Sequence, residues 1–196
     1  MSTVLVAYAT RMGSTAEIAT VVAEVLRTRG LTVATSPCDA VRSVSDYDAV
    51  LLGSAIYLRH WQHDALGFLE RFGPQLAYRP TWLFQSGPLG PDDEEDSEDA
   101  DQQTTPRAVA RLVERFGLRE PTTFGGRLDS AAARDPVSRW VARGSLAGDF
   151  RDWSAIRAWA RSCADAIVSA PPRGLSRELS AALEPPASPT AGGAGS

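Results

Sequence analysis

The stretch TVLVAYATRMGSTAEIA, residues 3–19, decides the fold of this chain. Val4 to Ala7 form a short and nearly continuous apolar run, which is typical of a parallel strand buried on both faces. A turn rich in hydroxyl side chains follows at once and leads without a linker into an amphipathic helix. Backbone N–H groups at such a helix start converge on anions, so the stretch predicts a seat for a phosphate group.

Three hydroxyl side chains, those of Thr10, Ser14 and Thr15, surround Gly13 in this turn. Gly13 is the one residue there that adopts a positive φ freely, which lets the backbone curl around an anion. An ordinary strand-to-helix turn capped by serine and threonine is the alternative. There is no G-x-x-x-x-G-K-[ST] string, the chain contains no lysine, and the turn lacks the three glycines of a dinucleotide fingerprint. These absences argue against ATP and NAD as principal ligands.

The helix after this turn is predicted to begin at residue 14 or 15. Ser14 and Glu17 stand in the S-x-x-E spacing of a capping box, and Gly30 is placed to end the helix. The apolar residues between them follow helical spacing: Ile18, Val21, Val22, Val25 and Leu26.

The composition suits one globular domain with an uneven charge. The chain has 196 residues, of which 43% are hydrophobic, and a formal net charge of −4. Residues 92–101 (DDEEDSEDAD) hold eight acidic side chains and no basic one, so subtracting −8 from −4 leaves +4 on the rest. Such a run is typical of a solvated loop; a docking element for a basic partner, or a shield over the domain's own arginines, is the alternative. No basic stripe with interleaved aromatic residues is present, which argues against nucleic acid as a partner.

Targeting signals and metal motifs are missing from the sequence. No apolar run approaches the roughly 20 residues of a membrane helix, and the N-terminus lacks the charged and apolar regions of a signal peptide. We therefore expect a cytoplasmic protein with at most peripheral membrane contact. Cys38 and Cys163 lie far apart without a C-x-x-C motif, so neither a disulfide nor a zinc site is predicted. His60 and His63 would lie one helical turn apart, but no third ligand stands near them, so no metal is expected.

Strand and helix patterns alternate along the rest of the chain. Further strands are predicted at residues 31–35, 49–53, 81–85 and 121–125. Further helices are predicted at residues 66–72, where Gly73-Pro74 would end the helix, at 109–116 and at 152–168, with an irregular segment at 127–151. The alternation predicts an α/β domain over residues 1–169, with a five-stranded parallel sheet covered by helices on both faces. Residues 170–196, rich in Pro, Gly, Ala and Ser, are expected to form a disordered tail.

Three turns are expected to meet at one edge of this sheet, because ligands of such folds bind outside the carboxyl ends of the strands. They are residues 10–15, 53–61 and 86–90. The second contributes Tyr57 and Trp61, whose rings suit a flat aromatic ligand, although a loop aromatic more often packs. The third contributes backbone groups that would reach polar atoms at the edge of a ring. No Ser/His/Asp, Cys/His or paired-carboxylate arrangement stands out, so the catalytic residues stay unknown.

The chain resembles the flavodoxin family of FMN proteins over residues 3–169. The likeness is carried by the spacing Thr10-x-x-Gly13-x-Thr15 after a buried strand and by Gly53-Ser54 after the third strand. The resemblance implies a three-layer sandwich with strand order 2-1-3-4-5 and FMN as cofactor. The residues it implies for the FMN phosphate are Thr10, Arg11, Met12, Gly13, Ser14 and Thr15. The residues it implies beside the flavin ring are Ser54, Ala55, Ile56, Tyr57, Ser86, Gly87, Pro88 and Leu89.

Within that family the chain is most similar to the branch of the menaquinone-dependent protoporphyrinogen dehydrogenases. The closer likeness is carried by residues 8–15 (YATRMGST), 53–57 (GSAIY), 124–128 (FGGRL) and 152–153 (DW). It implies an oxidoreductase that acts on protoporphyrinogen or a similar substrate. The segment 129–151 is shorter and richer in small residues than the insertion of that branch, which puts quinone and porphyrin use in doubt.

Two other functions stay open. A non-catalytic electron carrier would dock a basic reductase through residues 92–101, although residues 54–57 lack the glycine that electron-carrier flavodoxins commonly place beside the flavin. The second open function is that of an interaction module, a flavodoxin-like domain that has lost its cofactor. The oxidoreductase and the electron carrier each imply a redox partner, either a protein or a small-molecule electron donor or acceptor.

Overall fold

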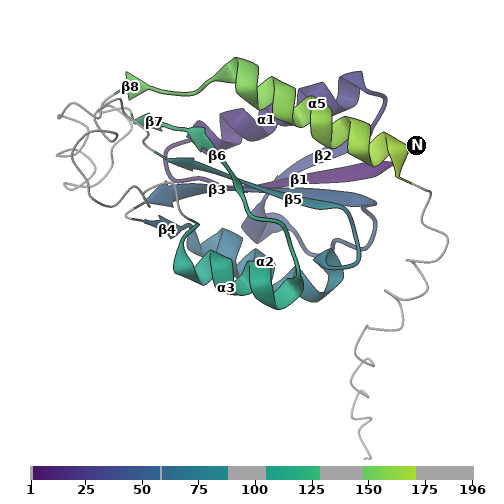
Figure 1. Ribbon diagram of the computed structural model, residues 1–196, viewed down its shortest axis with the longest axis horizontal. Helices are drawn as coiled ribbons and strands as arrows, with labels where there is room; N and C mark the ends of the chain where they lie inside the picture. Colours follow the sequence, from purple (N-terminus) through teal and green to yellow (C-terminus); the bar gives the residue numbers. More distant parts are fainter. Residues whose placement is uncertain (1, 58, 88–104, 129–147, 171–196) are drawn as a thin grey trace, which may run out of the picture.

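The computed structural model describes residues 2–57, 59–87, 105–128 and 148–170, and it shows a sheet between two layers of helices (Figure 1). The main sheet has the order β2-β1-β3-β5-β6, with all neighbours parallel. Its strands are β1 (Thr3–Ala9), β2 (Thr32–Pro37), β3 (Ala49–Tyr57), β5 (Thr81–Gly87) and β6 (Thr122–Gly125). A two-residue strand, β4 (His60–Trp61), pairs antiparallel with the end of β3 and lies off this path. The predicted order 2-1-3-4-5 is confirmed once β4 is set aside.

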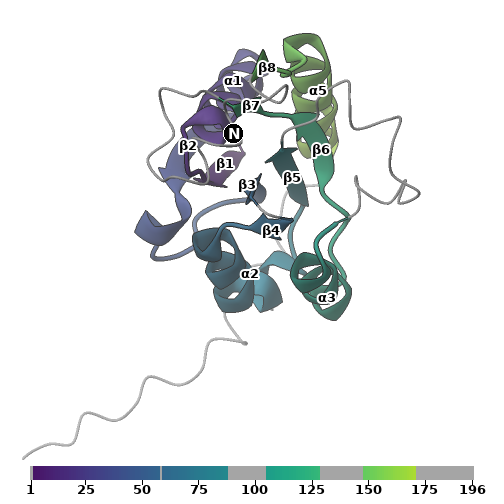
Figure 2. The same ribbon diagram turned by 90° about the vertical axis from the view of Figure 1, so that its left-hand side faces the viewer.

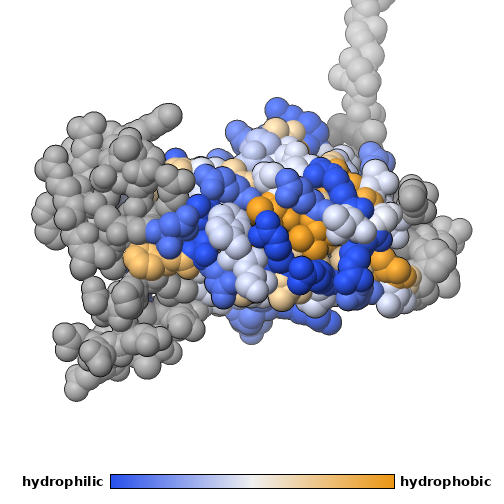
Figure 3. Space-filling model, turned by 90° about the horizontal axis from the view of Figure 1, so that it is seen from above, coloured by the Kyte–Doolittle hydropathy of each residue, from blue (hydrophilic) through white to orange (hydrophobic). Residues whose placement is uncertain are grey.

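Helices cover both faces of the sheet. One face carries α1 (Ser14–Thr28) and α5 (Trp153–Ser169), and the other carries α2 (His63–Leu76) and α3 (Arg107–Phe116). A short 3₁₀ helix, η1 (Cys38–Ala40), follows β2. Figure 2 looks toward the edge where the parallel strands end, and shows the three layers one above another. The outer side of the α1 and α5 layer is mostly hydrophilic, with small apolar areas between the polar side chains (Figure 3).

The strands send side chains alternately into two cores. In β1, Val4 and Val6 pack under α1 and α5, whereas Leu5 and Ala7 pack against the core of α2 and α3. All four side chains are completely buried. The doubly buried first strand predicted from its continuous apolar run is therefore confirmed.

The predicted end of the second helix and the predicted irregular segment at 127–151 are both wrong. α2 does not end at Gly73-Pro74 but continues to Leu76. A Cβ atom at Gly73 would lie 2.2 Å from the Phe116 ring of α3, so this glycine makes room for a helix–helix contact instead of ending the helix. Residues 127–151 are not wholly irregular, because β7 (Arg127–Leu128) and β8 (Gly148–Asp149) form an antiparallel pair.

Other expectations fall on parts of the chain that the structure does not describe. These are the acidic run at 92–101, most of the segment 129–151, and the predicted tail from residue 171 onward. Among the described residues, none of the helices combines the length and the apolar character needed to cross a membrane.

Both cysteine thiols are buried, Cys38 at 5% and Cys163 at 1% exposure. Burial raises the pKa of Cys163 from 9.0 to about 12 and raises that of Cys38 as well. Because the pKa is higher in the folded chain than in the unfolded one, the protonated thiols stabilise the fold at pH values below 9.0. This contribution to the free energy of unfolding is lost as the pH rises toward 12. We expect a thiol reagent at pH 8 to label the unfolded chain but not the folded one.

The free energy of unfolding should also fall above pH 9 by more in the wild type than in a Cys38→Ala/Cys163→Ala variant, since only the former carries the thiols. Rapid labelling of the folded protein, or equal pH dependence of the two proteins in urea titrations, would contradict this expectation.

Candidate functional site

The turn between β1 and α1 is held by a glycine with a left-handed backbone. Gly13 has φ 88° and is the N-cap of α1, and its N–H donates to the Thr10 hydroxyl at 3.0 Å. No atom would lie within 4 Å of a Cβ at this position, so φ itself, and not crowding, selects glycine here. The predicted positive φ at Gly13 is confirmed.

The open end of α1 faces this turn. The N–H of Glu17 makes the first helical bond, to the carbonyl of Gly13 at 3.1 Å, so the N–H groups of Thr15 and Ala16 precede it. The predicted helix start is confirmed, but the capping box is wrong. Ser14 is the first residue of the helix and not its cap, and the Glu17 carboxylate accepts a bond from Arg151.

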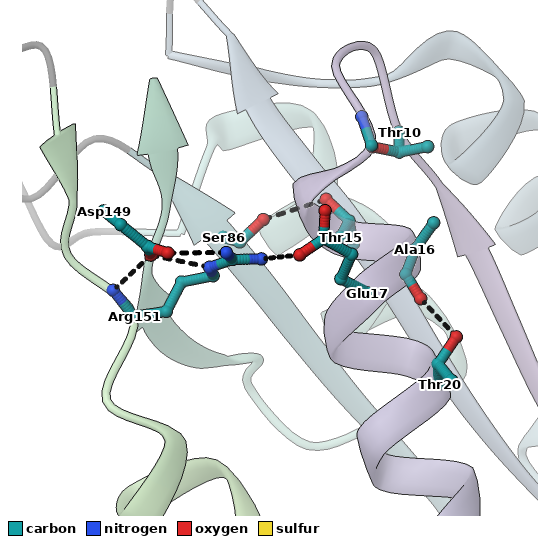
Figure 4. A network of polar contacts seen from close by, with 9 residues as sticks. Thr10, Thr15, Ala16, Glu17, Thr20, Ser86, Asp149 and Arg151 are labelled. Carbon is teal, nitrogen blue, oxygen red and sulfur yellow. Dashed lines mark hydrogen bonds and ion pairs between the residues drawn. The ribbon is translucent and has the colours of Figure 1, made fainter. Parts of the chain in front are cut away.

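A buried hydrogen bond joins the turn after β1 to the end of β5. The hydroxyls of Thr15 and Ser86 lie 2.8 Å apart, and the two residues are 0% and 3% exposed (Figure 4). They are 71 positions apart in the chain. The structure therefore brings together two of the three segments predicted to meet at this edge.

The third segment is a strand end and not an open turn. β3 runs to Tyr57, and Ile56 and Tyr57 pair with Trp61 and His60 of β4. The prediction that the strand ends at residue 53 is wrong. The reason is local pairing: the Ser54 hydroxyl accepts a bond from the N–H of Gln62 at 3.0 Å and closes the hairpin from its base.

Trp61 is a packing residue within this hairpin. It is 3% exposed, and its indole N–H donates to the Gln85 side-chain oxygen at 2.8 Å. The Gln85 amide in turn donates to the Thr123 hydroxyl at 2.8 Å, which links β4, β5 and β6. Of the two alternatives that the sequence left open for this ring, packing is confirmed and a position at the rim is wrong, because its polar partner Gln85 is itself buried.

Tyr57 does lie beside the first turn. The Arg11 guanidinium carbon sits 4.1 Å from the centroid of the Tyr57 ring, which is a cation–π distance. Arg11 is exposed, Tyr57 is half-buried, and Met12 between Arg11 and Gly13 is also half-buried. The turn after β1 and the end of β3 therefore share one aromatic contact.

The end of β5 packs tightly against the chain that follows β6. A Cβ at Gly126 would lie 2.6 Å from the carbonyl oxygen of Gly87, and one at Gly125 would lie 1.9 Å from that of Phe150. A Cβ at Gly87 would lie 3.5 Å from Ile56. Gly125 and Gly126 therefore let backbones approach at the strand ends, whereas a side chain at Gly87 would make only ordinary contact with Ile56. Pro88 and Leu89, also predicted to flank the ring, lie outside the described residues.

Arg151 is a residue of this edge that the sequence did not single out. Its side chain is 3% exposed and donates to both carboxylate oxygens of Asp149, at 2.7 and 2.6 Å, and to Glu17 at 2.6 Å (Figure 4). The guanidinium also lies 4.4 Å from the Trp153 ring. Its hydrogen bonds to Asp149 raise the pKa of Arg151, an effect that burial opposes in part. Nothing in the sequence distinguishes it from the other arginines.

The profile of the flavodoxin domain family matches residues 5–132, which is more than half of the chain. No curated protein sequence matches the chain.

Solved structures share the fold at low sequence identity. A short-chain flavodoxin associated with a bacterial microcompartment has a TM-score of 0.58 at 15% identity, covering 85% of this chain and 99% of that one. Flavodoxin 1 from Bacillus cereus has a TM-score of 0.54 at 13% identity, covering 84% and 98%. Rubredoxin oxygen:oxidoreductase from Desulfovibrio gigas has a TM-score of 0.55 at 19% identity over 87% of this chain, which spans only 38% of that protein. With the family profile matched over most of the sheet, the chain belongs to the flavodoxin domain family.

Proposed function

We propose that this chain is an FMN-binding redox protein, with the phosphate seated at Thr10 to Thr15 and the flavin ring held between residues 54–57 and 86–89. The observation that carries the proposal is the buried bond between Thr15 and Ser86. It joins the turn at residues 10–15, where the phosphate would bind, to the end of β5, where the flavin ring would lie. One FMN molecule would therefore contact both segments.

The residues at the strand ends fit FMN chemically. The turn offers the hydroxyls of Thr10, Ser14 and Thr15 and the N–H groups at the start of α1, which suit a phosphate dianion. Tyr57 offers a half-buried aromatic face next to that turn. When bound, the flavin supplies the redox chemistry, and the protein binds it, orients it and limits its contact with water.

Within this function we propose an oxidoreductase that resembles the protoporphyrinogen dehydrogenases. One observation that supports an enzyme over a simple carrier is the β3–β4 hairpin: the segment beside the ring, Ser54 to Tyr57, is paired strand without a glycine. The electron carrier is the second candidate, favoured by the eight carboxylates at 92–101 as a dock for a basic reductase. We further propose that residues 1–169 form the folded unit and that the remainder is a tail.

Reconstitution tests the proposal directly. The purified chain, incubated with excess FMN and then desalted, is expected to retain one FMN per chain, to show the visible flavin absorption and to quench flavin fluorescence. Riboflavin should bind at least about tenfold more weakly, because hydrogen bonds to a charged phosphate contribute about 1.5–3 kcal/mol each. A chain that stays colourless with excess FMN would overturn the proposal.

A redox titration of the FMN-loaded protein separates the two forms of the proposal. The enzyme is expected to take up two electrons in a single step, whereas the carrier is expected to take them up in two resolved one-electron steps. Deleting residues 92–101 should raise the Michaelis constant for a basic reductase only if the carrier form is correct.

A further inference from the structure

A charged cluster of three side chains lies at the first turn of α1, beside the proposed phosphate seat. Arg151, two residues before α5, reaches between Asp149 of β8 and Glu17 of α1 (Figure 4). Thr15, whose hydroxyl is bonded to that of Ser86, lies two residues before Glu17 in the first turn of α1. The Arg151 side chain is 3% exposed, whereas those of Glu17 and Asp149 are 51% and 44% exposed. The cluster is therefore a buried cation held by two carboxylates that still contact water.

Glu17 is the member that bears on a ligand. It is the fourth residue of α1, about 5 Å along the helix axis from Ser14. A carboxylate in the first turn stabilises the helix through its dipole, but it repels a phosphate bound at the same end. Arg151 contacts this carboxylate at 2.6 Å and so reduces the repulsion that a phosphate at this end of α1 would meet.

We infer that Arg151 is a positioning residue that gives the site its preference for phosphorylated flavin over riboflavin, by neutralising Glu17. The inference rests on the proposed function. Asp149 holds the guanidinium in place through two bonds, at 2.7 and 2.6 Å, so the charge stays fixed against Glu17 instead of moving with solvent.

Arg151 also has a structural role, because it joins α1 to α5 and stacks on Trp153. A purely structural role and a charge role predict different measurements. Loss of the structural link would persist in the double variant and at high salt, since both leave α1 without its bond to Arg151. Loss of neutralisation would weaken FMN alone, since only FMN carries the phosphate.

The experiment measures dissociation constants of FMN and riboflavin by fluorescence quenching for six proteins: wild type, Arg151→Met, Glu17→Gln, the double variant, Arg151→Lys and the control Arg29→Met. Arg151→Met is expected to lower the ratio of riboflavin to FMN dissociation constants about fivefold, a size typical of removing one positive charge within about 10 Å of a dianion near solvent. The double variant should restore the ratio to the wild-type value, and Arg151→Lys should retain it. The deficit of Arg151→Met should shrink at high salt.

Arg29→Met is the matched control. Arg29 pairs with Asp165 at 2.8 Å near the far end of α1, so its loss changes the net charge equally without touching the phosphate end, and the ratio should not move. Thermal melts establish that each variant is folded. If wild type binds FMN but Arg151→Met keeps the wild-type ratio, or Glu17→Gln does not rescue it, the inference fails and the proposed function stands. If wild type binds neither flavin, both fail.

Discussion

Replacing Gly53 with valine is expected to lower the free energy of unfolding by about 3 kcal/mol, as overpacking of a closed core does. Gly53 lies in β3 between Tyr8 of β1 and Phe84 of β5. A Cβ atom there would lie 2.1 Å from the Phe84 ring. Phe84 cannot retreat, because it is completely buried and packs edge-on against Trp159 at 5.6 Å. Urea titration of the purified domain measures the loss.

Two further variants make this expectation specific. Gly67→Ala in α2 introduces a Cβ into open space and should stabilise the domain by about 0.5–1 kcal/mol, as alanine does in a helix interior. Adding Phe84→Leu to Gly53→Val should recover part of the loss, because the smaller side chain vacates the space. A Gly53→Val protein as stable as wild type would show that the Phe84 ring does not need this glycine.

Replacing Gly13 with valine is expected to weaken FMN binding about fivefold to thirtyfold, the equivalent of the roughly 1–2 kcal/mol that a left-handed backbone costs a non-glycine residue. In the free protein, valine would relax out of φ 88° and open the turn between Thr10 and Ser14. Binding would then have to restore the strained conformation. Fluorescence titration with FMN measures the change.

Gly30→Val provides the control for this expectation. Gly30 has φ 80° and open space at its Cβ, but it lies just beyond α1 at the opposite end from the turn. Both variants should lose stability by at most about 2 kcal/mol, and only Gly13→Val should lose FMN affinity. Equal FMN affinity in Gly13→Val and wild type would contradict the assignment of this turn to the phosphate.

Gly13 and Gly53 differ in where the residues that determine their roles lie in the chain. Gly13 stands between a strand pattern and a helix pattern, so its role is encoded by neighbours in the chain and was predicted. Gly53 was interpreted as the start of a turn, because its partner Phe84 is far away in sequence. The continuation of β3 to Tyr57 was missed for the same reason, since its cause is a bond between Ser54 and Gln62 and pairing with Trp61.

The sequence by itself determined the α/β class and the turn with a left-handed glycine between the first strand and the first helix, because periodicity and turn chemistry act over a few neighbouring residues. The order of the strands came from the resemblance to the flavodoxin family. Only the tertiary structure decided which distant groups share the edge of the sheet: Thr15 with Ser86, Arg11 with Tyr57, and Arg151 with Glu17. Each of these contacts joins residues at least 46 positions apart, as Arg11 and Tyr57 are. Such contacts follow from how helices and strands pack, and no local pattern in the chain records them.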